Sequence, residues 1–230
     1  SLLQRAFAAG RVPHAYIFAG PEGVGKFKTA LEWARLLLCG NPIIEEGRVE
    51  SVDSCGYCES CRAFDTNAHP DFNHIYKELL EFTKDGKGKT TPIDLPIAVI
   101  REFLVDKVSA RPSLSQRKVF VVSEAEKLNN SSQNSLLKIL EEPPGDCCII
   151  LLCTRLEKLL QTTRSRCRIV PFGPIDEDVV VEKLLAKGLD QKRSTYFARL
   201  SQGSLGLALS WAGLESGEAG LYEIKRQVIA

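Results

Sequence analysis

A glycine-rich stretch near the N-terminus, GPEGVGK at 20–26, has the residue types of a phosphate-binding loop. Gly20, Gly23 and Gly25 would let successive backbone N–H groups turn toward an anion, because glycine has no side chain in the way. Lys26 would place an ammonium group on the phosphate oxygens. The next residue in this pattern is normally a serine or threonine whose hydroxyl binds Mg²⁺, but here it is Phe27. These residues predict an anion site that lacks one of its metal ligands.

The second half of a nucleotide-hydrolysing site is also altered. An acidic pair should follow an apolar strand, whereas the apolar run at 118–122 is followed by Ser123 and Glu124. Glu124 could still polarise a water molecule, but the carboxylate that would hold the hydrated metal ion is replaced. Because both changes remove ligands from the same ion, we expect weak or absent binding of ATP and Mg²⁺, and no hydrolysis.

Four cysteines in the first quarter of the chain have the spacing of a metal site: Cys39, Cys55, Cys58 and Cys61. A tetrahedral zinc ion takes four thiolates, and a CxxC step lets two sulfurs reach one ion across a tight turn, which Gly56 favours. Disulfides and an iron–sulfur cluster are the alternatives, although disulfides are rare in cytosolic chains and no other redox feature accompanies the cluster. We predict a structural zinc site without an open coordination position. His69 and His74 are interpreted as residues beside strands and not as ligands.

The composition is that of a globular chain, with 44% hydrophobic and 26% charged residues among 230. The net charge of +1 gives no general attraction to nucleic acid or anionic lipid. No apolar run approaches the roughly 20 residues of a membrane span, and Arg5 and Arg11 interrupt the apolar stretch at the N-terminus. We therefore expect a cytosolic protein with no membrane partner.

Short apolar runs alternate with helical patterns over the first 172 residues. Strands are predicted at 14–20, 71–77, 147–154 and 167–172, and the stretch at 118–128 is predicted as a strand leading into a turn. Helices are predicted after the glycine loop and at 93–112 and 129–144. The helix after the loop should bury one face, formed by Phe27, Leu31, Ala34 and Leu38. The later cysteines lie in or beside the apolar runs and are interpreted as small buried hydrophobic residues: Cys147, Cys148, Cys153 and Cys167.

This order of elements predicts an α/β fold, with a parallel sheet covered by helices on both faces. The loop at 20–26 would then lie at the carboxyl ends of the strands, where such sheets bind ligands. From residue 176 onward the sequence shows helical periodicity alone. We predict a sheet domain over residues 1–172 and a small all-helical domain over 173–230.

Several stretches together resemble bacterial DNA polymerase III clamp-loader subunits, which belong to the AAA+ class of P-loop NTPases. They are PHAYIFAGPEGVGK (13–26), the cysteine insertion at 39–61, HPDF (69–72), NSLLKILEEPP (134–144) and TRSRC (163–167). The resemblance covers residues 1 to about 210. It implies an AAA+ sheet domain with an inserted zinc knuckle, followed by a helical lid domain. A collar domain would normally follow, and we expect it to be absent from this sequence.

The resemblance also implies roles for single residues. Phe27 and Ser123 favour the delta prime type of subunit, a catalytically degenerate stator, over the ATP-hydrolysing gamma/tau type. Gly206 occupies the position where active members carry an arginine that senses the γ-phosphate, and Thr154 the position of a polar residue that inspects nucleotide. Arg166, in the Ser-Arg-Cys motif, would reach a neighbouring subunit's ATP in trans.

The partners implied are the gamma/tau and delta subunits, the sliding clamp, and primed DNA through the complex, in a replisome at the bacterial nucleoid. Three other functions remain open on the residues alone. They are an active gamma/tau-type ATPase, a zinc-bearing adaptor with no nucleotide role, and a P-loop kinase. The kinase is the weakest, since it needs the same Mg²⁺ geometry.

Overall fold

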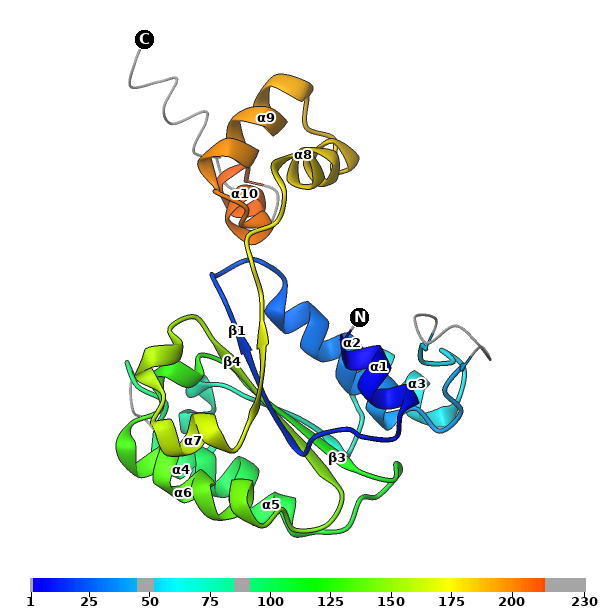
Figure 1. Cartoon of the computed structure of the whole chain (residues 1–230), viewed down its shortest axis with the longest axis vertical. Helices are drawn as coiled ribbons and strands as arrows, with labels where there is room; N and C mark the ends of the chain where they lie inside the picture. The colour runs from blue at the N-terminus through cyan, green and yellow to red at the C-terminus, as the bar shows by residue number, and fades with distance from the viewer. Residues whose placement is uncertain (1, 45–51, 85–91, 214–230) are drawn as a thin grey trace. The chain divides into compact units, whose positions relative to one another are not determined.

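The computed structural model describes residues 2–44, 52–84 and 92–213, which form two compact units (Figure 1). The first unit consists of Ser1–Ala19 and Phe27–Val170, and the second of Gly20–Lys26 and Pro171–Ala230. The sequence pattern predicted that the glycine loop belongs to the sheet domain. In the structure its contacts assign it to the second, helical unit.

The first unit is built on a five-stranded sheet with the order β2-β3-β4-β1-β5. The pairs β2–β3, β3–β4 and β4–β1 are parallel, and Ile17 lies opposite Leu151 in the central pair. All five predicted strands are confirmed: β3 begins at residue 118, as predicted, and the other four are trimmed at one or both ends. Their bounds are β1 Ala15–Ala19, β2 Phe72–Ile75, β3 Lys118–Val122, β4 Cys147–Cys153 and β5 Arg168–Pro171.

Helices cover both faces of this sheet, as predicted (Figure 1). Along the chain they are α1 Leu2–Ala8, α2 Lys26–Leu38, α3 Glu59–Asp65, α4 Ile97–Ile100, α5 Asp106–Val108, α6 Asn130–Glu141 and α7 Gln161–Ser165. A π-helical turn, Arg101–Val105, joins α4 to α5, so the helix predicted at 93–112 runs from 97 to 108. It begins after Pro96, whose backbone is extended. Short 3-10 helices η1, η3 and η4 cover Lys77–Phe82, Ala125–Lys127 and Leu156–Lys158.

Successive side chains of β1 point to opposite faces of the sheet, so they pack in two different cores. Ala15 and Ile17 join α4 and α6 in one cluster, whereas Tyr16 and Phe18 lie on the opposite side of the strand. The Tyr16 ring meets the ring of Trp33 from α2 edge-on, with ring centroids 6.0 Å apart. The sheet is therefore buried on both faces, which explains why β3 and β4 read as unbroken apolar runs.

The predicted buried face of α2 is partly wrong. Ala34 and Leu38 are buried, but Leu31 is only half-buried and Phe27 is 40% exposed. The buried stripe instead includes Ala30 and Trp33. Phe27 fits the helical spacing, but it lies in the first turn of the helix, where its ring packs on a histidine and not in the core.

Up to residue 213, the second unit has three helices, α8 Glu177–Ala186, α9 Gln191–Leu200 and α10 Leu205–Trp211. They enclose a small core that includes Val180, Leu184, Phe197 and Ala208. The end of the predicted helical domain, from 214 on, lies outside the described residues. Within the described part of the chain, no helix is both long and apolar enough to cross a membrane.

Candidate functional site

The lysine of the glycine loop bonds to the loop itself. Lys26 is buried, and its Nζ donates to the carbonyl oxygens of Gly20 at 2.7 Å and Pro21 at 2.5 Å. Gly23 and Gly25 adopt φ values of +71° and +94°, which an L side chain would strain. The backbone thus has the turned conformation of a phosphate loop, while its ammonium group already has two carbonyl partners.

The same loop is packed against the start of α10. The N–H of Gly206 donates to the carbonyl oxygen of Gly23 at 3.0 Å. A Cβ on Gly23 would collide with the Ser204 hydroxyl, and a Cβ on Gly206 would lie 2.9 Å from the Gly23 Cα. Both positions therefore require glycine. The residue that stands in place of the expected sensor arginine makes a backbone contact with the loop.

At the carboxyl end of β3, Glu124 is held by two lysines. Lys127 Nζ donates to one carboxylate oxygen, and Lys77 Nζ lies 3.5 Å from the other. Burial alone would raise the pKa of Glu124, but the hydrogen bond and charge of Lys127, together with Lys77, lower it. A carboxylate of lowered pKa is a weaker general base, and two ammonium groups beside it oppose a divalent cation.

Phe27 and Ser123, which stand in place of the expected metal ligands, both contact His74, and none of these side chains carries a negative charge. The Phe27 ring lies 4.7 Å from the His74 ring, and the His74 ring lies 4.9 Å from that of Tyr76. His74 Nε2 is 2.8 Å from the Ser123 hydroxyl. Burial lowers the pKa of His74, so this imidazole is neutral at pH 7. None of these groups is a hard oxygen anion of the kind that Mg²⁺ prefers.

Thr154, a residue of the predicted degenerate nucleotide site, is bonded to another carboxylate. Its hydroxyl donates to one oxygen of Glu126 and its backbone N–H donates to the other at 3.2 Å. Glu126 belongs to η3, directly after Glu124 and Ala125. The structure thus brings Thr154 to the turn that follows β3. The loop residues at 20–26 belong to the second unit, whereas Glu124 and Thr154 belong to the first.

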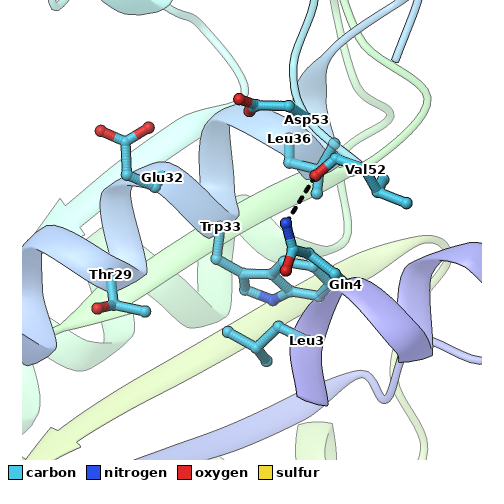
Figure 2. A pocket seen from close by; sticks show the side chains of 8 residues that line it. All are labelled: Leu3, Gln4, Thr29, Glu32, Trp33, Leu36, Val52 and Asp53. Carbon is cyan, nitrogen blue, oxygen red and sulfur yellow. Dashed lines mark hydrogen bonds between the residues drawn. The ribbon is translucent and has the colours of Figure 1, made fainter. Parts of the chain in front are cut away.

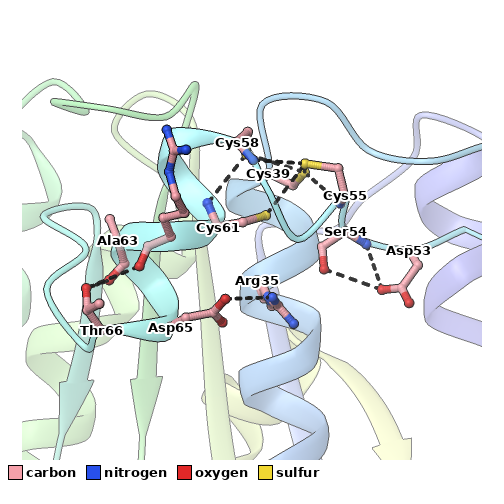
Figure 3. Close-up of polar contacts among 11 residues, drawn as sticks. Arg35, Cys39, Asp53, Ser54, Cys55, Cys58, Cys61, Ala63, Asp65 and Thr66 are labelled. Carbon is pink, nitrogen blue, oxygen red and sulfur yellow. Dashed lines mark hydrogen bonds and ion pairs between the residues drawn. The ribbon is translucent and has the colours of Figure 1, made fainter.

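The four predicted metal-binding cysteines converge at one point, as Figure 3 shows. Their sulfur atoms all lie within 4.8 Å of one another. The Cys39 sulfur is 3.5 Å from that of Cys55 and 3.9 Å from that of Cys58, and Cys55 and Cys61 are also 3.9 Å apart. A tetrahedral ion with zinc–sulfur bonds of about 2.3 Å places its sulfurs about 3.8 Å apart. The separations fit such an ion and are too long for disulfide bonds.

Backbone N–H groups point at these sulfurs. Cys55 N lies 3.3 Å from Cys39 Sγ, and Cys61 N lies 3.4 Å from Cys58 Sγ, which also caps the start of α3. Burial would raise the pKa of Cys58, but the backbone N–H groups of Cys61 and Gly40 and the neighbouring thiols lower it to about 6. Gly56 takes a φ of +78° in the turn between two of the cysteines. Backbone N–H groups thus stabilise a thiolate at Cys58, whereas burial raises the pKa of Cys61 to about 12, so a bound cation would be needed to hold all four sulfurs as thiolates.

A buried hydrogen-bond network attaches this cysteine module to the sheet. The hydroxyls of Ser60 and Ser115 donate to the carbonyl oxygen of Leu38, at 2.6 and 2.9 Å. His69 Nε2 lies 2.8 Å from the Ser60 hydroxyl. Burial lowers the pKa of His69, which keeps the ring neutral. His69 and His74 lie outside the cysteine cluster, as predicted.

Asp71 forms the base of the same network. Its fully buried carboxylate accepts the backbone N–H groups of Ser113, Leu114 and Ser115 at 2.7 to 2.8 Å. Its own N–H donates to His69 Nδ1 at 3.1 Å. Burial would raise the pKa of Asp71, but the three N–H donors lower it. A charge is therefore held inside the protein mainly by backbone N–H dipoles.

Arg166 lies at the end of α7, far along the chain from the other candidates. Its Nη2 forms an ion pair with Glu141 Oε1 at 2.6 Å, and its Nη1 donates to the Thr162 carbonyl oxygen at 2.8 Å. About a third of the side chain is exposed. The predicted trans-acting arginine is thus at the surface and held in one orientation.

A cavity of about 200 Å³ lies between α1, α2 and the segment at 52–53 (Figure 2). Gln4 crosses it and donates to the Val52 carbonyl oxygen at 3.1 Å. It contains none of the predicted site residues. Its lining consists of Leu3, Gln4, Thr29, Glu32, Trp33, Leu36, Val52 and Asp53.

Sequence reasoning did not identify several residues that shape these sites. Lys77 and Lys127 neutralise Glu124, Glu126 engages Thr154, and Glu141 pairs with Arg166. The HPDF stretch contributed to the family resemblance, but no spacing rule indicated that Asp71 binds three backbone N–H groups. The sequence signal that could have identified these acids and lysines is their position beside the predicted strands and motifs.

The fold and the glycine loop define the class: an AAA+ type of P-loop domain followed by helices. The fold is similar to that of a solved RuvB mutant of Thermotoga maritima, with a TM-score of 0.51 and 14% identity. That similarity covers 91% of this chain and 56% of the RuvB chain. At this identity the likeness concerns the fold alone.

Sequence relatives are more specific. DNA polymerase III subunit delta′ of Escherichia coli is 32% identical over 210 residues, which cover 90% of this chain and 57% of the relative. DNA polymerase III subunit gamma/tau of Mycobacterium bovis is 36% identical over 170 residues, 74% of this chain and 26% of that relative. The chain thus spans little more than half of the delta′ relative. The family model described as DNA polymerase III, delta subunit, matches residues 1–176, and the chain belongs to this family.

Proposed function

We propose that this chain is a delta prime-like subunit of the DNA polymerase III clamp loader, a degenerate AAA+ stator that does not itself hydrolyse ATP. Its partners in this proposal are the gamma/tau and delta subunits, the sliding clamp, and primed DNA bound by the complex, in the cytoplasmic replisome. The membership in the DNA polymerase III delta family supports the choice of complex. The proposed AAA+ domain covers 1–172 and the proposed lid covers 173–230.

The observation that carries the degenerate assignment is the chemistry at the end of β3. Glu124 is paired with Lys77 and Lys127, and the neighbouring positions hold Phe27 and Ser123 in place of metal ligands. Hydrolysis of a phosphoanhydride needs a metal ion to neutralise the developing charge and a group to orient water. The ammonium groups of Lys77 and Lys127 repel a metal ion, and they pair with the Glu124 carboxylate that would otherwise orient water. Lys26, which is bonded to its own loop, supports the same conclusion.

The test is ATP binding and turnover by the purified chain, with and without Mg²⁺. We expect no turnover above that of a Lys26→Ala control and no effect of Mg²⁺ on nucleotide affinity. Phosphate release that requires Mg²⁺ and disappears in Lys26→Ala would contradict the proposal.

Arg166 is proposed to act on the ATP of a neighbouring subunit. Its exposure and the position of its Ser-Arg-Cys motif support this role. An arginine supplied in trans to a phosphoryl-transfer site contributes roughly 10³–10⁵-fold to the rate at that site. Arg166→Ala in the full-length subunit should therefore strongly reduce clamp loading by the reconstituted complex. The overall effect should be smaller than the effect at the single site, because the other ATP sites of the complex are unchanged. Loading at the wild-type rate would exclude the trans role.

The cysteine module is proposed to hold one structural zinc ion through Cys39, Cys55, Cys58 and Cys61. The sulfur separations and the N–H groups directed at them support this assignment. With four thiolates the ion would have no open position, so the module would stabilise structure and not catalyse a reaction. Zinc analysis of freshly purified protein tests it, and less than half an equivalent would count against the ion.

Two other candidates are favoured by single observations. The 36% identity to a gamma/tau subunit favours an active ATPase, which predicts turnover that Lys26→Ala abolishes. The well-formed cysteine cluster favours a zinc-bearing adaptor with no nucleotide role, which predicts that Arg166→Ala leaves the ATPase rate of the complex unchanged. The two substitutions therefore separate all three functions.

A further inference from the structure

The contacts of Arg166 are made with two different helices. Glu141, the last residue of α6, accepts from Nη2 at 2.6 Å, and Thr162, in the first turn of α7, accepts from Nη1 at 2.8 Å. A guanidinium group has five N–H donors. Two of them are used by these contacts, so the group can be held on one side while its other donors remain available to a phosphate.

The two helices that carry these acceptors are fixed to each other by a buried amide. Gln133, in α6, accepts from the backbone N–H of Leu160, which precedes α7, at 2.8 Å. Its Nε2 donates to the carbonyl oxygen of Leu128 at 3.0 Å. At the other end of α6, His14 Nε2 donates to the Leu140 carbonyl oxygen at 2.9 Å. The backbone of Arg166 and the carboxylate of Glu141 therefore lie on two helices that are hydrogen-bonded to each other.

The position of Glu141 is unfavourable for the helix itself. It lies at the carboxyl end of α6, where the helix dipole is negative and acidic side chains are disfavoured. Both partners of the ion pair are substantially exposed, so the pair contributes little to folding stability. The acid at 141 thus stabilises neither the helix end nor the fold to a large extent, and what it contacts is the Arg166 guanidinium group.

We propose that Glu141 is a positioning residue for Arg166, which it orders before the neighbouring subunit's nucleotide is engaged. This inference rests on the proposed trans role of Arg166. An arginine side chain loses considerable rotamer freedom when it is fixed on a phosphate. Because Glu141 and Thr162 already restrict the side chain, less conformational entropy is lost when Arg166 engages the phosphate in the transition state. This preorganisation should raise the rate constant of hydrolysis more than the affinity for ATP.

The experiment is a double-mutant cycle in the reconstituted complex that carries the full-length subunit. Glu141→Ala should lower the single-turnover rate of ATP hydrolysis about three- to tenfold, with little change in KM, since Thr162 still holds one N–H group. Glu141→Gln keeps an oxygen acceptor of the same length and should recover most of the rate. Glu142→Ala removes the same charge one residue later and should stay within about twofold of wild type.

The decisive comparison is made in the Arg166→Ala background. If Glu141 acts through Arg166, Glu141→Ala should have no further effect there. An equal effect in both backgrounds would indicate a general structural role and would overturn the inference. So would a Glu141→Ala rate at or above that of wild type in a complex that Arg166→Ala impairs. If Arg166→Ala itself has no effect, the proposed function fails first, and the two failures are thereby distinguished.

Discussion

The cysteine module and the glycine loop both combine regular spacing with a chemistry that needs an ion, and they differ in how their side chains are arranged. The cysteine sulfurs lie 3.5 to 3.9 Å apart in three of their pairs and receive backbone N–H groups, as a bound ion would require. In the glycine loop, the backbone has the expected turn, but Lys26 donates to the loop's own carbonyl oxygens. Spacing thus predicted the backbone in both regions, whereas only in the cysteine module are the side chains arranged for the predicted ion.

The largest expected effect is on the cysteine module. Cys61→Ser, or removal of metal with a chelator, should abolish the zinc content of about one ion per chain and unfold this region. The binding free energy of a structural zinc site is on the order of 10 kcal/mol and is coupled to folding. Metal analysis and urea unfolding measure both effects. Cys167→Ala, at a partly buried cysteine outside the cluster, should leave the zinc content unchanged.

The second effect concerns the buried carboxylate beneath the module. Asp71→Asn should destabilise the protein by about 3–5 kcal/mol, because the amide cannot replace an anion that accepts three backbone N–H groups. Urea unfolding measures the loss. The control is Asp65→Asn, at an exposed ion pair with Arg35, which should change the stability by less than about 1 kcal/mol. Equal losses in the two variants would contradict the role of the buried network.

The same network should make stability fall in acid. The pKa of His69 is lowered in the folded protein, so the unfolded chain takes up a proton first as the pH falls below about 6.5, and stability declines. His74 acts in the same direction. The pKa of Asp71 is also lowered, so a further loss should begin below about pH 4.

Thermal unfolding as a function of pH measures both phases. Asp71→Asn should remove part of the second phase and leave the first. Stability that is constant from pH 7 to pH 5 would contradict the lowered pKa values of His69 and His74.

The smallest expected effect sharpens the account of the glycine loop. The double variant Phe27→Thr with Ser123→Asp restores the two missing oxygen ligands, yet it should leave ATP turnover within about twofold of background. Lys77 and Lys127 still neutralise Glu124, and Lys26 is still bonded to its own loop. Turnover assays test this outcome. Strong turnover by the double variant would show that the missing ligands alone silence the site.

Much of the fold was predictable because apolar runs and stop signals act locally. The five strands and the end of α6 before Pro143 follow from residue type and spacing. The face of α2 was misjudged at Phe27, since helical periodicity does not reveal that the first turn has no core to pack against. The ion pair of Arg166 joins residues 25 positions apart, and its geometry arises from the packing of α6 and α7. Long-range partners of this kind depend on the tertiary structure and leave no local pattern.

The contact between Gly23 and Gly206 limits which residues position 206 can accept. An arginine at position 206 would bring a Cβ to 2.9 Å from the Gly23 Cα, so this single change would first have to push the two backbones apart. The loop at 20–26 and the start of α10 thus constrain each other's sequence, because a side chain at either glycine would require a compensating shift in the other segment.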